Sequence, residues 1–382
     1  MQQILTYTFL VFYTVTILSI VLVIITDNRN PLKTLPWIIV LVFAPVVGLA
    51  FYFFFGQNLS KRRIISRRTR RRITMQLEEA RDTGRPEIPE EHRRLAALLY
   101  STTHSVALYG SRITPYTDGR SKMEALLAEI ARAKHHIHIQ YYIFCDDETG
   151  RRLRDALVEK VRQGVEVRIL YDDVGCSGVK KDFFEGMRRE GIEVFSFLHV
   201  KFPLFTSKVN YRNHRKIAVI DGRVGFIGGM NVADRYVRGT GWGSWRDTHF
   251  RIEGSGAAGL QVSFLSDWSA TTKQHITGAA YFPQSERHAE NILQIVPSGP
   301  FGQWRALLQA DSYAVSNARR RIWIQTPYYL PSDVLNTALQ VAALAGVDVR
   351  LMLPARSDSK IVDLASHSYL DDMMKAGVKI LF

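Results

Sequence analysis

The amino-acid sequence predicts an α/β protein with a duplicated βαβ unit and mainly parallel sheets, preceded by two transmembrane helices. Three observations support this fold class. Helix-like and strand-like runs alternate along the middle of the chain, three short stretches recur at a nearly constant separation, and two long uncharged segments open the sequence. Alternating strands and helices are typical of a parallel sheet covered by helices on both faces.

Apolar periodicity defines the elements of the first unit. Runs with a helical period alternate with short runs rich in Ile, Val and Tyr. The predicted order is helix 122–132, strand 135–144, helix 151–163, strand 165–170, helix 183–189 and strand 192–197.

A second copy of this unit begins near the C-terminal end. The stretch Ile137–Ile143 is similar to Ile322–Tyr328, at a separation of 185 residues. Two other pairs recur at separations of 182 and 186 residues. A nearly constant offset indicates duplication of one structural unit. These pairs are Gly164–Leu170 with Gly346–Met352, and Gly191–Phe195 with Gly377–Leu381.

The first 56 residues predict a two-helix membrane anchor. Residues 4–26 and 35–55 carry no charge, and each run is long enough to cross a bilayer as a helix. A cleaved signal peptide fits less well, because no basic region precedes the first run and a second run follows at once.

A basic cluster follows this anchor. Residues 61–72 contain eight Lys or Arg, whereas the turn between the two apolar runs has only Arg29 and Lys33. The positive-inside rule therefore predicts that everything after residue 56 faces the cytoplasm. The cluster contributes strongly to the net charge of +14 and fits attraction to anionic lipid. A nucleic-acid patch and a solvated charge run are the alternatives.

Four regions are predicted along the chain. Residues 1–56 form the anchor and residues 57–108 a basic juxtamembrane segment and linker that includes a short helix at 90–100. Residues 109–285 form the first repeat and residues 286–382 an incomplete second repeat. A hydrophobic fraction of 46% suffices for a sizeable core. The two cysteines give neither a disulfide framework nor a metal-ligand cluster.

The segment most informative about chemistry carries His214, Lys216 and Asp221 in the pattern H-x-K-x-x-x-x-D, followed by Gly228-Gly-Met-Asn231. Side chains two residues apart on a strand share a face, so His214 and Lys216 point the same way. An imidazole can attack a phosphodiester or protonate it, and an ammonium can hold a phosphate oxygen. Asp221 has the opposite parity, so contact with His214 is not assumed. A packing or surface histidine is the plain alternative for so short a pattern.

Further motifs give this segment a family resemblance. Residues 210–231, with Trp245-Arg-Asp247, Pro297-Ser-Gly-Pro300 and Thr326–Pro331, resemble the phospholipase D superfamily and, within it, the bacterial cardiolipin synthases. The resemblance covers essentially the whole chain. It implies two phospholipase D-like repeats packed about a pseudo-two-fold axis, with the active site between them, in a multi-pass protein of the bacterial cytoplasmic (inner) membrane.

The same resemblance implies a phosphatidyltransferase that joins two phosphatidylglycerol molecules into cardiolipin and releases glycerol. His214 would carry the lipid as a phosphohistidine, and Lys216 and Asn231 would hold the phosphoryl oxygens. Asp221 completes the catalytic motif. Phosphatidylglycerol and anionic membrane lipid would be the partners, and oligomers are possible. No nucleic acid, cofactor or metal is expected.

The family carries two copies of the motif, and only one occurs in this sequence. The repeat offset places a second histidine at about position 400, beyond Phe382. We therefore expect a chain truncated within the second repeat, and inactive alone unless two chains combine their motifs.

Two features near the motif add hypotheses. Asp247 could accept a hydrogen bond from His214 and set its tautomer, or simply cap the following strand. Phe202 and Phe205 lie on an apolar stretch bracketed by lysines, which suits a lipid entry site; core packing is the alternative.

Other polar clusters predict structural roles. His135, His136 and His138 resemble a metal cluster but lack a carboxylate or cysteine partner set. Residues 146–148 match a calcium loop only faintly. Asp172 ends a predicted strand, where its carboxylate either lines a cleft or caps a turn.

Two other functions compete with lipid transfer. A membrane-tethered phospholipase or nuclease of the same superfamily would use water as the acceptor, and would give phosphatidic acid from phosphatidylglycerol. A non-catalytic, membrane-anchored binding module would show no turnover.

Overall fold

The computed structural model of the chain forms two compact units. Unit 1 comprises residues 1–85 and 108–293, and unit 2 comprises residues 86–107 and 294–382. The structure describes residues 1–27, 31–44, 47–48, 51–52, 67–79, 87–197, 212–241, 243–284, 286–299 and 303–382.

Unit 1 is built around a seven-stranded sheet with the order β2-β8-β7-β6-β3-β4-β5. Its central strands β3 and β6 are buried along their whole length. The strands are β2 (Arg112–Tyr116), β3 (His136–Tyr141), β4 (Glu166–Asp172), β5 (Glu193–Phe197), β6 (Lys216–Ile220), β7 (Val224–Gly228) and β8 (His249–Glu253).

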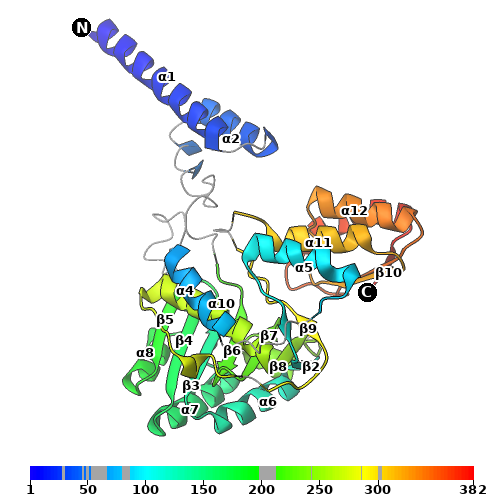
Figure 1. Cartoon of the computed structure of the whole chain (residues 1–382). Helices are drawn as coiled ribbons and strands as arrows, with labels where there is room; N and C mark the ends of the chain where they lie inside the picture. The colour runs from blue at the N-terminus through cyan, green and yellow to red at the C-terminus, as the bar shows by residue number, and fades with distance from the viewer. Residues whose placement is uncertain are drawn as a thin grey trace. The chain divides into compact units, whose positions relative to one another are not determined.

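Helices cover both faces of this sheet, as Figure 1 shows. On one face, α6 and α7 bury Leu126, Ile130, Leu153 and Leu157 against the apolar side chains of β3 and β4. On the other face, α10 packs along the sheet and α4 packs against α10. The helices are α4 (Arg67–Glu79), α6 (Gly119–Arg132), α7 (Glu148–Arg162), α8 (Lys181–Arg189), α9 (Asp234–Arg238) and α10 (Ser255–Thr272).

Strand alternation places two kinds of residue on the two faces of β3. Ile137 and Ile139 belong to the apolar core beneath α6 and α7. His136, His138 and Gln140 have the opposite parity and bond to Gln261 and Asp267 of α10. The sheet therefore has one apolar face and one face with a buried polar row.

The predicted helices and strands between residues 119 and 197 are confirmed, with ends that differ by no more than about three residues. The expectation of a mainly parallel sheet is wrong for unit 1. Only β3–β4 and β4–β5 pair in parallel in its described sheet, whereas β2–β8, β8–β7, β7–β6 and β6–β3 are antiparallel. A tight turn at residues 221–223 makes β6 and β7 antiparallel, since a short connection forces antiparallel pairing. The other three antiparallel pairs join strands that longer segments of the chain separate.

Small elements complete unit 1. Strand β1 (Leu108–Tyr109) pairs antiparallel with β9 (Ile292–Leu293). A 3-10 helix, η4 (Ala279–Tyr281), places the Tyr281 ring against the histidines of β3.

Unit 2 contains a three-stranded parallel sheet with the order β10-β11-β12. Val349, Leu351 and Val378 are buried in its core with Leu339 and Met373. Its elements are α5 (Glu90–Thr103), α11 (Ala306–Asn317), β10 (Arg321–Gln325), α12 (Asp333–Leu344), β11 (Asp348–Met352), α13 (Lys360–His367), α14 (Leu370–Lys375) and β12 (Lys379–Leu381).

The N-terminal segment forms the helices α1 (Gln2–Asp27) and α2 (Pro31–Phe43). Across the described ranges, no helix has both the length and the apolar content needed to cross a membrane. Helix α2 has 13 residues, or about 20 Å at 1.5 Å per residue, whereas a bilayer core is about 30 Å thick. This finding overturns the predicted multi-pass membrane topology with its two spanning helices.

Candidate active site

His214 and Lys216 lie side by side where the chain enters β6. Lys216 is the first residue of the strand and is 3% exposed, whereas His214 precedes the strand and is exposed. Nζ of Lys216 lies 3.0 Å from Nδ1 of His214 and donates to the His214 carbonyl oxygen at 2.8 Å. The Tyr142 ring packs against the imidazole, with centroids 4.6 Å apart. The predicted pairing of imidazole and ammonium is therefore present.

The electrostatic setting favours a neutral imidazole beside a charged lysine. Burial on the side facing its neighbours lowers the pKa of His214, the Lys216 charge lowers it further, and Asp172 acts in the opposite sense. Burial lowers the pKa of Lys216 to about 8, with Asp247 opposing this shift. At neutral pH the His214 imidazole is thus neutral, with one unprotonated ring nitrogen, while most Lys216 side chains remain protonated.

Asp172 holds the main chain just before His214. Its Oδ2 accepts the Asn213 N–H at 2.9 Å, and its Oδ1 accepts the N–H groups of Val174 and Gly175, both at 3.0 Å. Arg212 lies 3.6 Å from the same carboxylate. Asp172 is 1% exposed. It caps a turn, as one of the two sequence interpretations held, and it also anchors the motif.

Asp247 interacts electrostatically with Lys216. The Lys216 charge lowers the pKa of Asp247 while burial, the larger effect, raises it. Oδ1 of Asp247 accepts the Thr248 N–H at 2.6 Å. The carboxylate also fills the space above Gly229, where an added Cβ would lie 2.1 Å from Oδ1. Within the described residues no hydrogen bond joins Asp247 to His214, so its role as orienter stays a prediction.

The side chains of Asn231 and Asp221 form hydrogen bonds to residues other than His214 and Lys216. Asn231 is 5% exposed, accepts the Ile143 N–H at 3.0 Å and donates to the Tyr236 hydroxyl at 2.7 Å. Asp221 lies after the far end of β6, with a left-handed φ of 51°. Its carboxylate accepts the N–H groups of residues 134, 135 and 136 at 2.8–2.9 Å. The structure therefore does not bring Asp221 to His214, and Asn231 uses one of the two N–H groups of its amide in the bond to Tyr236.

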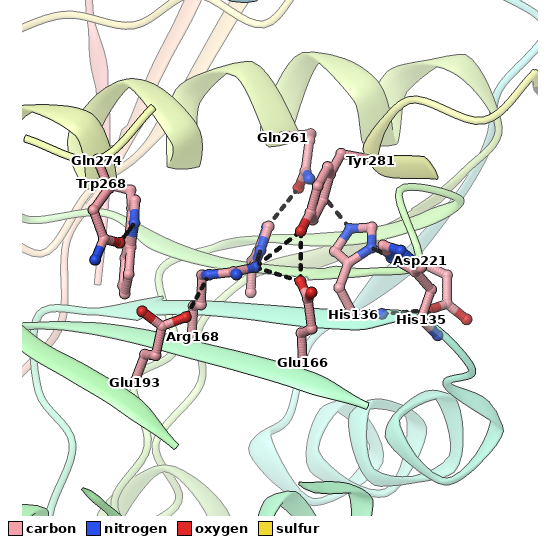
Figure 2. Close-up of polar contacts among 11 residues, drawn as sticks. His135, His136, Glu166, Arg168, Glu193, Asp221, Gln261, Trp268, Gln274 and Tyr281 are labelled. Atoms are coloured by element: carbon pink, nitrogen blue, oxygen red, sulfur yellow. Dashed lines mark hydrogen bonds and ion pairs between the residues drawn. The ribbon is translucent and has the colours of Figure 1, made fainter. Parts of the chain in front are cut away.

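The histidines of β3 belong to a buried polar network between the sheet and α10, drawn in Figure 2. His136 bonds to Gln261 at 3.2 Å, and Gln261 bonds to His138 at 3.0 Å. Arg168 lies 3.4 Å from Nε2 of His138 and pairs with Glu166 at 2.8 Å. Burial lowers the pKa of His136 to about 3. This network ties α10 to the sheet.

Phe202 and Phe205, the predicted lipid entry residues, lie outside the described residues. Sequence reasoning also missed Asp267, a carboxylate that is 8% exposed on α10 and accepts hydrogen bonds from both neighbours of His214. The available signal was a single acidic residue within the apolar run of residues 256–270.

The fold and the H-x-K pair define a phospholipase D-like protein. Residues 126–242 and 313–382 match the family described as "Cardiolipin synthase, PLD-like domain", and residues 12–57 match "Phospholipase_D-nuclease N-terminal". The crystal structure of phosphatidylserine synthase from Haemophilus influenzae shares the fold, with a TM-score of 0.52 and 15% identity over 75% of this chain and 73% of that one.

Curated relatives narrow this class. A cardiolipin synthase from Alkalihalophilus pseudofirmus is 37% identical over 97% of this chain and 75% of its own length. The major cardiolipin synthase of Bacillus subtilis is 36% identical over 97% of this chain and 79% of its own length. The chain belongs to the cardiolipin synthase family.

Proposed function

We propose that this protein is a cardiolipin synthase that moves a phosphatidyl group from one phosphatidylglycerol to another. The observation that carries the proposal is the exposed His214 imidazole beside the buried Lys216 ammonium, 3.0 Å away, in a chain of this family. A neutral nitrogen nucleophile and a fixed cation are the two groups that nucleophilic attack on a phosphodiester requires.

The reaction proceeds by two displacements at phosphorus. In the first, the His214 nitrogen bonds to phosphorus, the bond to the headgroup oxygen breaks, and glycerol leaves with a proton from a general acid. In the second, a headgroup hydroxyl of another phosphatidylglycerol gives its proton to the same group, attacks phosphorus and releases neutral His214. Family resemblance assigns this acid–base role to the histidine of a second H-x-K motif. Lys216 holds a non-bridging oxygen, where negative charge develops.

Three subsidiary roles belong to the same proposal. Asn231 joins Lys216 on the phosphoryl oxygens through the second N–H of its amide, while it keeps its bonds to Ile143 and Tyr236. Asp221 supports the motif through the backbone of residues 134–136 rather than through the substrate. The cations of residues 61–72 attract anionic lipid headgroups.

The proposal also treats residues 109–285 and 286–382 as two phospholipase D-like repeats. In support, β10, β11 and β12 pair in parallel in chain order, as β3, β4 and β5 do, and they carry the three recurring sequence stretches.

Mass spectrometry of the products from phosphatidylglycerol vesicles tests the function. Cardiolipin with an equal amount of glycerol is the expected result. Phosphatidic acid in place of cardiolipin would instead identify a hydrolase. His214→Asn should abolish transfer and the acid-labile phospholipid adduct on the protein. Unchanged cardiolipin formation by that variant would contradict the proposal.

A further inference from the structure

Asp267 carries a carboxylate within a largely buried, apolar stretch of α10. It lies on α10, where Leu260, Phe264 and Trp268 are completely buried, and it is itself 8% exposed. Burying a carboxylate is costly unless hydrogen-bond donors surround it. A carboxylate retained on this helix must therefore be satisfied by specific partners.

Those partners converge on one oxygen. Oδ2 of Asp267 accepts from Nδ2 of Asn213 at 2.9 Å, from Nε2 of Gln140 at 2.7 Å and from Nη1 of Arg215. The Arg215 contact is also an ion pair. Asn213 and Arg215 are the two residues on either side of His214 in the chain. One side chain of α10 thus holds both neighbours of the proposed nucleophile.

The backbone around His214 needs such support. Strand β6 begins at Lys216, so residues 212–215 lie outside the hydrogen-bond ladder of the sheet. Their order depends on side-chain contacts. The Arg215 N–H donates to Oδ1 of Asn213 at 3.1 Å, and the Asn213 N–H donates to Asp172.

These contacts constrain the imidazole. Asn213 and Arg215 bond to Asp267 of α10, whereas the His214 imidazole lies beside Lys216 and the Tyr142 ring. The two neighbours of His214 are therefore held on the α10 side while the imidazole is kept beside Lys216. Loss of the Asp267 contacts removes one support from each neighbour of His214, while Asp172 still accepts the Asn213 N–H.

We infer that Asp267 is a positioning residue, which aligns His214 for attack by holding Asn213 and Arg215 against α10. This inference rests on the proposed role of His214 as nucleophile. Asp267 contacts no reacting atom in this arrangement; it acts through its two partners.

Asp267→Asn tests the inference, because the amide keeps the size of the side chain but loses the charge. We expect kcat for cardiolipin formation to fall about 10–100-fold with KM changed less than about twofold, since small misplacement of a reacting group slows chemistry more than binding. Gln261→Leu is the matched control. It removes another fully buried polar group of α10, whose partners His136 and His138 do not flank His214. It should lower the melting temperature without lowering kcat.

Arg215→Met provides a second route, should Asp267→Asn fold poorly. This variant should also lower kcat, and the double variant should be no slower than Asp267→Asn alone, because the Arg215 side chain acts through its contact with Asp267. Wild-type kcat in Asp267→Asn and Arg215→Met would overturn the inference, as would an equal loss in Gln261→Leu.

A readout that does not depend on turnover separates this inference from the proposed function. The Cε1–H NMR signal of His214, assigned by its loss in His214→Asn, should shift or broaden in Asp267→Asn and stay in place in Gln261→Leu. An unshifted signal in Asp267→Asn overturns the positioning role. Absence of transferase activity in the full-length enzyme contradicts the proposed function, and the NMR comparison still decides the role of Asp267.

Discussion

Nζ of Lys216 lies 3.0 Å from Nδ1 of His214 and also donates to the carbonyl oxygen of that residue at 2.8 Å. A cation this close opposes protonation of the imidazole, and burial shifts each group toward its neutral form. The pair therefore has a pH window in which the imidazole is neutral and the ammonium is charged. The window extends from the lowered pKa of His214 up to about 8, the pKa of Lys216.

The first prediction concerns the charge of Lys216. Lys216→Gln should raise the pKa of His214, because the nearby cation that disfavours the imidazolium is removed. NMR titration of the His214 ring measures this pKa without any need for activity. Arg246→Gln, which removes an exposed cation beside Asp247, should leave it within about 0.3 units. A pKa that stays or falls in Lys216→Gln would show that Lys216 does not act on His214.

The second prediction separates two roles of Asp247. The negative charge of Asp247 raises the pKa of Lys216 against the effect of burial, so Asp247→Asn should lower that pKa below about 8. The alkaline limb of the kcat/KM profile should then move to lower pH, by roughly half to one unit. If Asp247 instead orients His214, the variant will lose turnover at every pH while the alkaline limb keeps its position.

The third prediction concerns Asp221. Its carboxylate accepts three backbone N–H groups from residues 134–136, and its backbone has a left-handed φ. Asp221→Ala should lower the free energy of unfolding by about 1–3 kcal/mol, because those donors lose their acceptor. Asp221→Asn retains one acceptor oxygen and tolerates this φ, so it should lose less. Equal unfolding midpoints in urea for Asp221→Ala and the wild type would refute this structural role.

Local pattern predicted the elements well and the sheet poorly. Helix α7 and strand β4 follow from periodicity within a few residues of sequence, and both are present. The direction of β6 beside β3 depends on pairing between strands about eighty residues apart, which no local pattern encodes. The Asp221-Gly222 turn was the one available signal for the antiparallel hairpin.

The contacts of the candidate site also fall into two groups, those that local sequence predicts and those that it does not. The proximity of His214 and Lys216 follows from a spacing of two residues in extended chain, so the sequence predicts it. Asp172 and Asp267 reach the motif from 42 and 53 residues away along the chain. Their contacts with Asn213 arise only when β4 and α10 pack beside the start of β6. Tertiary packing, not local pattern, decides which carboxylates serve the nucleophile.

The last prediction concerns stability against acid. His136 and His138 are completely buried, and burial lowers the pKa of both, that of His136 to about 3. In the unfolded chain a histidine titrates near 6.5. Above that pH both states hold the imidazole neutral, and stability is at its full value. As the pH falls from about 6.5 toward about 3, the imidazole binds a proton in the unfolded state but not in the folded state, so stability is lost.

Each such histidine should lower the free energy of unfolding by up to about 1.4 kcal/mol per pH unit in this range. Urea unfolding between pH 5 and 7.5 measures how the free energy of unfolding changes with pH, above the range in which carboxylates titrate. His136→Gln should reduce this pH dependence by the contribution of about one proton. His92→Gln, at a residue whose side chain is 63% exposed, should leave it unchanged. A slope identical in wild type and His136→Gln would mean that His136 is charged in the folded protein, contrary to its position between β3 and α10.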